Sequence, residues 1–205
     1  MKPNRLVVGI SGASGVIYGI RLLEVLQDVP DYETHLVLSN AARQTILLET
    51  DYKIKEVEEL AAQNYRFTDI AASLASGSFK TIGMVVLPCS MKTLSGIALS
   101  FSDNLLLRAA DVTLKDRRPL ILGVRETPLH LGHLRLMTQV VEIGGVIAPP
   151  MPAFYHHPQT IADIVNQTVN RILDLLNIQL PQDLFERWSG ANWPQKSEGE
   201  EGQEQ

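Results

Sequence analysis

The chain has 205 residues, of which 18 are Lys or Arg and 23 are Asp or Glu, so its formal net charge at pH 7 is −5. This balance argues against nucleic acid as the main partner, because proteins that bind phosphate backbones use clustered Lys and Arg. The composition is that of a globular protein without a membrane span, and the single cysteine, Cys89, excludes an internal disulfide framework and favours the cytoplasm.

Short apolar runs alternate along the chain with longer amphipathic stretches. Because the runs are continuously hydrophobic, they predict strands buried on both faces at residues 5–10, 34–38, 82–87, 120–124 and 145–148. The stretches between them predict helices at residues 15–27, 40–49, 55–63, 92–100, 104–117, 130–142 and 159–177. This order predicts a three-layer α/β/α fold, a Rossmann-like (flavodoxin-like) open parallel sheet with helices on both faces.

The domain organisation is expected to be simple. No low-complexity linker divides residues 1–189, so we expect one domain there. Residues 190–205 are acidic, polar and without periodicity, and we expect them to form a disordered tail.

Small, hydroxyl and charged residues follow the predicted strands. In open α/β sheets, ligands bind outside the carboxyl ends of the strands, where the strand order reverses. We therefore expect a site built from the segments that follow the strands, which are residues 11–15, 39–40, 88–93, 125–127 and 149–157.

The first of these segments places glycines at positions 9, 12 and 15. Such a turn presents backbone N–H groups and a helix N-terminus to an anion. It is not the G-x-G-x-x-G dinucleotide fingerprint, and the second strand ends in Ser39 and Asn40 rather than in an acid that could hold a ribose. The pattern favours a mononucleotide over NAD, and a tight turn without a ligand is the alternative.

Several candidates also have a purely structural interpretation. Ser90 and Thr93 are placed to cap a helix, or to offer hydroxyls to the edge of a heterocycle. A lone cysteine beside an apolar strand, such as Cys89, is more typical of packing than of a nucleophile. Arg108 and Lys115 lie on one helix face, as in a solvated stripe of salt bridges.

The remaining candidates differ in how strongly they suggest a ligand. Arg125 ends a predicted buried strand, where its charge needs a partner such as a bound phosphate. Glu49 and Trp188 are by default a helix-end carboxylate and a packing aromatic. His156 and His157 are adjacent, which does not suit zinc, and the chain has no D-D-x-x-D segment, so we expect no metal.

A set of motifs in fixed order gives the chain a family resemblance over residues 4–188. The motifs are Gly12-Ala13-Ser14-Gly15, Glu49-Thr50-Asp51, the segments 88–95, 108–112, 114–120 and 125–128, and Phe154-Tyr155-His156. With these motifs the chain resembles the flavin prenyltransferases of the UbiX type. The resemblance implies a metal-independent enzyme that joins the dimethylallyl group of dimethylallyl monophosphate to N5 and C6 of reduced FMN.

The same resemblance implies partners. Prenylated FMN would pass to UbiD-type decarboxylases, for example in ubiquinone biosynthesis, and the chain would form a homo-oligomer, a dodecamer with sites shared between chains. No nucleic acid and no membrane span are implied.

The resemblance also implies roles for individual residues. The FMN set is Gly12, Ala13, Ser14, Ser39, Ser90, Met91, Lys92, Thr93 and Arg125. The dimethylallyl-phosphate set is Arg108, Lys115, Arg125, Glu126, Tyr155 and Arg171, with Arg108 supplied by a neighbouring chain. The catalytic set is Ser14, Glu49, Lys115, Glu126, Tyr155 and Trp188. In it, Ser14 and Glu49 would handle protons near N5, and Tyr155 and Trp188 would offer π faces to an allylic cation.

Two other functions are compatible with a flavin site. A flavin-dependent cysteine decarboxylase of the related homo-oligomeric fold would carry Pro-Ala-Ser-Ala-Asn-Thr where this chain has Pro-Cys-Ser-Met-Lys-Thr at residues 88–93. A non-catalytic flavin-binding module would have no use for a second phosphate site, for which Lys115, Arg125 and Arg171 are predicted to meet.

Overall fold

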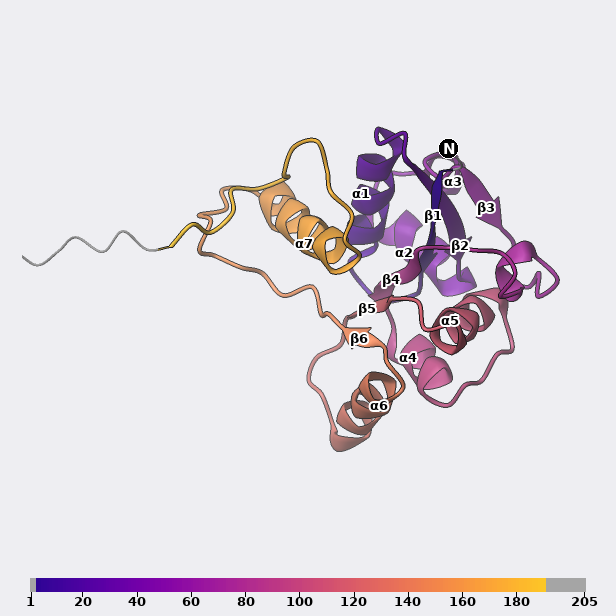
Figure 1. The fold of residues 1–205 in the computed structure, drawn as a ribbon. Helices are drawn as coiled ribbons and strands as arrows, with labels where there is room; N and C mark the ends of the chain where they lie inside the picture. Colours follow the sequence, from indigo (N-terminus) through magenta and orange to yellow (C-terminus); the bar gives the residue numbers. More distant parts are fainter. Residues whose placement is uncertain (1–2, 191–205) are drawn as a thin grey trace, which may run out of the picture.

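The computed structural model describes residues 3–190, and the segment 191–205, which holds almost all of the predicted tail, lies outside the described residues. A parallel sheet forms the centre of the molecule (Figure 1). Its strands are β1 (Asn4–Ile10), β2 (Tyr32–Leu38), β3 (Gln63–Tyr65), β4 (Gly83–Cys89), β5 (Leu120–Val124) and β6 (Val146–Ile147). The helices are α1 (Val16–Gln27), α2 (Asn40–Glu49), α3 (Ile54–Glu59), α4 (Met91–Ala98), α5 (Leu105–Lys115), α6 (Leu131–Glu142) and α7 (Ile161–Leu175), with a 3₁₀ turn η1 (Ser73–Ala75).

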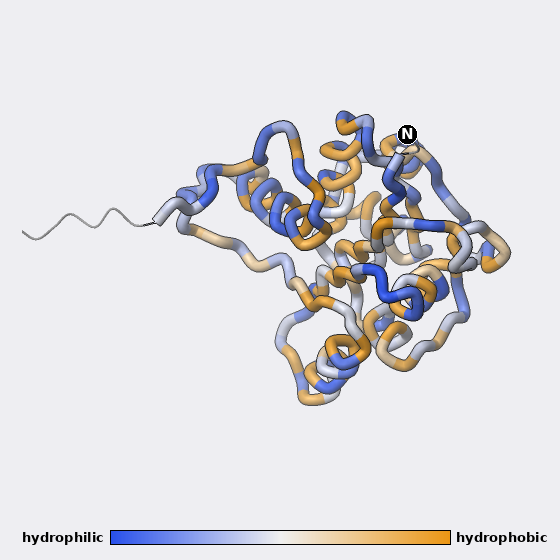
Figure 2. The backbone as a smooth tube through the Cα atoms, viewed as in Figure 1, coloured by the Kyte–Doolittle hydropathy of each residue, from blue (hydrophilic) through white to orange (hydrophobic). Residues whose placement is uncertain are grey.

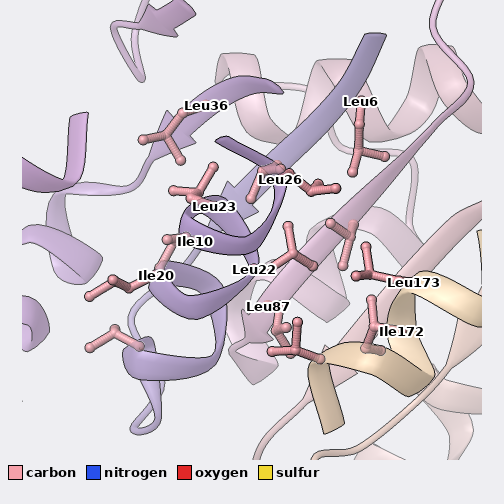
Figure 3. Close-up of a cluster of buried hydrophobic side chains, with 14 of the residues drawn as sticks. Leu6, Ile10, Ile20, Leu22, Leu23, Leu26, Leu36, Leu87, Ile172 and Leu173 are labelled. Carbon is pink, nitrogen blue, oxygen red and sulfur yellow. The ribbon is translucent and has the colours of Figure 1, made fainter. Parts of the chain in front are cut away.

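Helices cover both faces of the sheet, which confirms the predicted three-layer fold. Alternate residues of β1 point to opposite faces, so that Leu6 joins one buried cluster and Val7 the other. The first cluster packs α1 and α7 on the sheet through residues such as Leu23 and Leu173 (Figure 3). The second packs α4, α5 and α6 on the opposite face.

The order of strands in the sheet is β3-β2-β1-β4-β5-β6. The chain leaves β1 toward the α1 face and leaves β4 toward the α4 face, so the connection reverses direction between these neighbouring strands. In doubly wound sheets this reversal opens a crevice at the carboxyl ends of the two strands, where ligands bind. The fold therefore places a candidate site after β1 and β4.

The strand β3 is absent from the sequence prediction, which instead gave a helix over residues 55–63. The structure ends α3 at Glu59, and Gln63–Tyr65 then pairs in parallel with β2 at the edge of the sheet. The short polar run of β3 has no apolar pattern to reveal it, and tertiary contacts hold it: the Tyr65 hydroxyl lies 2.9 Å from Nδ1 of the buried His35. The prediction at residues 60–63 was wrong because local helical pattern was outweighed by pairing.

Candidate functional site

The loops after β1 and β4 are joined by hydrogen bonds of Ser11. Its backbone N–H and its hydroxyl both donate to the Pro88 carbonyl, at 3.2 and 3.0 Å. The hydroxyl oxygen also accepts from the Ser90 backbone N–H at 2.7 Å. Ser11 is fully buried, so these bonds are shielded from water and fix the two loops at the crevice.

Three helices begin at the carboxyl ends of the strands, beside this crevice. At α1 the N-cap is Gly15, whose φ of 95° is in the left-handed region that glycine adopts without strain. At α2 the Ser39 side chain accepts from the Ala42 N–H, and at α4 the Ser90 side chain accepts from the Thr93 N–H. The capping interpretation of Ser90 is thus correct. The remaining N–H groups of these first turns favour an anion at the same place.

A hollow of about 290 Å³, which we call the glycine-loop cavity, lies among these helix ends. Its lining residues are Gly12, Ser39, Asn40, Ala41, Phe67, Ser90, Lys92, Thr93, Asn104 and Leu107. Residues 11–15, which we call the glycine loop, must approach α2 closely here, because a Cβ on residue 12 would lie 2.3 Å from the Ala41 Cβ. The cavity thus brings together five members of the FMN set. Ala13 and Ser14 lie next to Gly12 in the glycine loop, and Met91 packs against the second core cluster.

Four residues of this cavity were not predicted from the sequence: Ala41, Phe67, Asn104 and Leu107. Asn104 caps α5 by accepting from the Leu107 N–H at 3.1 Å, and an Asn before an apolar helix is a readable capping signal. Phe67 lies in the connection after β3 and carries no pattern that could have identified it.

This chemistry suits FMN. A flavin mononucleotide needs donors for a phosphate dianion and an apolar slot for a planar ring. The helix N-termini and hydroxyls supply the first, and Phe67 and Leu107 supply apolar surface.

Glu49 at the end of α2 contacts the glycine loop. Its Oε2 accepts from the Gly15 backbone N–H at 2.8 Å, which places the carboxylate at the N-terminus of α1 and next in sequence to the exposed Ser14. The neighbouring Leu47 and Leu48 are exposed in the single chain, so the apolar residues before Glu49 face outward. A hydrogen bond therefore holds Glu49 against the glycine loop, beside Ser14.

A second hollow of about 480 Å³, which we call the aromatic pocket, is lined by Tyr155, Arg171, Phe185, Arg187 and Trp188. The Tyr155 and Trp188 rings meet edge to face with centroids 6.0 Å apart, and Trp188 is 60% exposed. Three residues predicted from the sequence thus come together. Phe185 and Arg187 were missed, because they follow the last helix in a segment without periodicity.

Arg125 and Glu126 lie in the exposed loop after β5. The prediction that Arg125 ends a buried strand was wrong about its burial: the strand ends at Val124, the Arg125 N–H donates to the Cys89 carbonyl at 3.1 Å, and the side chain is exposed. Among residues 3–190 it forms no ion pair. Glu126 accepts from the Thr127 N–H.

Lys115 lies at the amino-terminal ends of the strands, opposite the candidate site. It ends α5 just before β5 begins, whereas Arg125 follows the end of β5. The 5 residues of that strand separate the two ends by about 16 Å. Lys115 instead contacts Asp116 at 3.4 Å and lines a separate hollow with Arg118. One chain alone therefore does not bring Lys115 to the phosphate predicted for Arg125 and Arg171.

The Arg108 side chain on α5 makes one bond within its helix and one to η1. Its Nη1 donates to Asp111 at 2.8 Å and its Nε to the Ala75 carbonyl at 3.2 Å. The salt-bridge stripe predicted from spacing is present for this pair. It does not extend to Lys115, which pairs with Asp116 instead.

Cys89 and the possible metal ligands have only a structural interpretation in the described residues. Burial raises the pKa of the Cys89 thiol, which agrees with packing rather than with nucleophilic chemistry. Within residues 3–190, no group of three or more His, Cys, Asp and Glu side chains is placed to hold a metal ion. No helix in the same range is long and apolar enough to cross a membrane.

Comparison with known proteins assigns the family. The Flavoprotein family model matches residues 1–173. The flavin prenyltransferase UbiX of Escherichia coli strain K12 is 68% identical over 188 residues, which are 92% of this chain and 100% of that protein. The chain belongs to the UbiX family of flavin prenyltransferases. The resemblance inferred from the ordered motifs is thereby confirmed.

Solved UbiX structures share the fold. AnUbiX (PadA1), in complex with FMN and dimethylallyl pyrophosphate, has a TM-score of 0.88 and 47% identity, covering 93% of this chain and 100% of its own. A dodecameric FMN-dependent UbiX-like decarboxylase from Escherichia coli O157:H7 has a TM-score of 0.87 and 47% identity, covering 91% and 100%.

Proposed function

We propose that this chain is a flavin prenyltransferase that joins the dimethylallyl group of dimethylallyl monophosphate to N5 and C6 of reduced FMN and releases phosphate. The observation that carries the proposal is the 68% identity to a flavin prenyltransferase over that protein's whole length. Two hollows suit the two substrates: the glycine-loop cavity for FMN, and the aromatic pocket for an apolar group that carries a phosphate. Reduced FMN, when bound, supplies the nucleophilic atoms.

Glu49 is proposed to handle a proton beside the flavin ring. Its Oε2 is held by the Gly15 N–H, which leaves Oε1 as the oxygen that can accept a proton. Ser14 lies next to Gly15 and is exposed, so its hydroxyl is available to relay that proton. The bond from Gly15 keeps the carboxylate in place without side-chain motion at the moment of transfer.

The aromatic pocket is proposed to bind the dimethylallyl group. The π faces of Tyr155 and Trp188 stabilise the positive charge that develops on the allyl group when the bond to phosphate breaks. The Arg171 guanidinium stabilises the charge that develops on the leaving phosphate. Arg125 and Glu126 are proposed to join this set from the loop after β5.

The chain is proposed to act as a homo-oligomer, a dodecamer like the related solved structure. On α6, Leu131, Leu134 and Val141 are exposed and Val140 is the buried residue. Figure 2 shows hydrophobic residues along this helix, which lies beside β6 at the edge of the molecule. Exposed apolar surface of this kind marks protein interfaces. Assembly would let Lys115 and Arg108 of one chain reach the phosphate held by Arg171 of another.

The product is proposed to serve UbiD-type decarboxylases, for example in ubiquinone biosynthesis, as the family resemblance implies. We propose the cytoplasm as its compartment, which suits a chain whose one cysteine is buried as a free thiol. A cysteine decarboxylase is disfavoured by the segment 88–93 and by the identity to prenyltransferases.

Phosphate release tests the proposal. We expect the protein to release inorganic phosphate from dimethylallyl monophosphate under anaerobic conditions, with a chelator present. One phosphate should be released for each FMN that is consumed. Release should require reduced FMN, because oxidised FMN lacks a nucleophilic N5. Release that does not depend on flavin would identify a phosphatase, and no release would favour a binding module.

A further inference from the structure

The carboxylate of Asp174 on α7 binds both arginines of the aromatic pocket. Arg171 Nη1 donates to Asp174 Oδ2 at 2.8 Å. Arg187 donates from Nη1 to Oδ2 at 3.0 Å and from Nη2 to Oδ1 at 2.8 Å. This two-pronged bond fixes the plane of the Arg187 guanidinium. One carboxylate thus sets the position of both cations that line the pocket.

Further contacts hold residues 183–188, which we call the C-terminal segment, against α7. Arg187 donates to Asp183 from Nε at 2.5 Å and from Nη2 at 2.6 Å. The buried Asn170 on α7 accepts from the Leu184 N–H at 2.8 Å and donates to Asp183 at 3.3 Å. The segment carries two of the pocket's three aromatic rings, so its attachment decides where those rings lie.

The two arginines differ in what they have left to offer a ligand. Arg187 uses its Nε and both terminal nitrogens in bonds to Asp174 and Asp183. Among residues 3–190, Arg171 donates to Asp174 alone, and its side chain is 53% exposed. A guanidinium has several N–H groups in a fixed geometry, so Arg171 keeps donors for a phosphate. Arg187 instead uses its donors to hold the C-terminal segment against α7.

Asp174 is ionised when these bonds form. Hydrogen bonds from Arg187 are the main cause that lowers its pKa from the ordinary value, and Arg171 contributes further. The carboxylate is 22% exposed, so it is partly shielded from solvent. Asparagine at this position would keep the shape but remove the charge and one of the two acceptor oxygens.

We propose that Asp174 is a positioning residue for the prenyl donor: it holds Arg171 ready for the donor phosphate, and it fastens the C-terminal segment, with Trp188, to α7. This inference rests on the proposed function. It predicts that Asp174 acts on donor binding, and not on FMN binding, because neither Asp174 nor its partners line the glycine-loop cavity.

Two variants separate the two roles. Asp174→Asn weakens both arginine contacts, whereas Asp183→Asn weakens the Arg187 contact and leaves Arg171 on Asp174. Glu186→Gln is the matched control, since it removes a negative charge from the same segment at an exposed residue that makes no ion pair within residues 3–190. Donor affinity is measured by calorimetry with dimethylallyl monophosphate, and KM, kcat and the FMN dissociation constant are measured beside it.

We expect Asp174→Asn to weaken donor binding and raise the donor KM by about tenfold, the effect of losing one charge-assisted bond. Its kcat should fall by a smaller factor than its donor KM rises, because Arg171 and Trp188 are displaced but still present, and its FMN affinity should stay within about twofold. Asp183→Asn should raise the donor KM by about threefold, and Glu186→Gln should not change it. If Asp174→Asn does not fold, Asp174→Glu, which keeps the charge but displaces it, should show the same pattern with a smaller increase in KM.

Trp188 emission gives a readout that does not need turnover. The chain has 2 tryptophans, so Trp193→Phe leaves Trp188 as the reporter. In this background both Asp variants should shift the emission to longer wavelength without any ligand, because the segment loosens. A donor affinity for Asp174→Asn within twofold of the unmodified protein, or equal losses in Asp174→Asn and Asp183→Asn, would overturn the positioning role. If the unmodified protein makes no product, the proposed function fails instead, while calorimetry and emission still test the placement of Arg171 and Trp188.

Discussion

Replacing Glu49 with Gln should lower the rate of prenylated-flavin formation by about 100-fold or more while leaving FMN binding nearly intact. Proton transfer by a positioned side chain contributes rate factors of this order. The Gln amide oxygen can still accept the Gly15 N–H that now reaches Glu49 Oε2 at 2.8 Å, so the loop should keep its shape. The amide cannot accept a proton. Product formation is followed by mass spectrometry and FMN affinity by fluorescence titration.

The matched control for this variant is Glu59→Gln. Glu59 is an exposed carboxylate that ends α3 and pairs with Lys55 at 3.4 Å, away from both hollows. It should leave the rate unchanged. Full activity of Glu49→Gln would remove Glu49 from the mechanism, and loss of FMN binding would show that its role is to support the glycine loop.

Two inactive variants should restore activity to each other when they share an oligomer. In one chain Lys115 and Arg125 lie at opposite ends of β5, so a phosphate that contacts Arg125, as proposed, would take Lys115 from a neighbouring chain. Lys115→Ala and Arg171→Ala should each lose most product formation, because each removes a cation from the leaving phosphate. Coexpressed in equal amounts, they should regain activity in about a quarter of the sites, those that draw both intact residues from different chains.

The control for this experiment is coexpression of two differently tagged copies of the same variant, which should stay inactive. Mixed oligomers are purified through both tags, and product is measured per site. Activity in the mixture no higher than in either parent would contradict a site that takes Lys115 and Arg171 from different chains.

The sheet could be predicted because its strands are continuously apolar. The runs around Leu6, Leu36, Val85 and Ile121 are buried on both faces of the sheet. The strand β3 has no such run, and the end of α5 was predicted at residue 117, two residues beyond Lys115. The single-domain expectation for residues 1–189 stays a prediction.

The candidate site was predictable where it follows the ends of strands. Gly12, Ser39 and Ser90 each follow an apolar run. Because the strands are parallel, all three residues lie at the carboxyl ends of the strands. The end of β5 at Val124 was predicted correctly, but the burial of Arg125 was not, because the exposure of the loop after a strand depends on tertiary packing. Phe185 and Arg187 could not be found, because packing of the C-terminal segment on α7 is a tertiary contact with no periodic pattern.

The distance between Lys115 and the rest of the phosphate set could not be read from the sequence either. Lys115 and Arg125 are close in sequence and flank the same strand, yet a strand separates its two ends by its full length. A single chain contains no pattern that states which residues meet across an interface.

Prenyl transfer to the flavin is measured by the mass of the flavin after reaction with a labelled donor. The protein is incubated anaerobically with reduced FMN and dimethylallyl monophosphate that carries deuterium throughout the dimethylallyl group. We expect a flavin heavier by one C5H8 unit with every donor deuterium retained, because both new bonds form to donor carbons and the proton lost comes from the flavin. An unchanged flavin mass would contradict prenyl transfer.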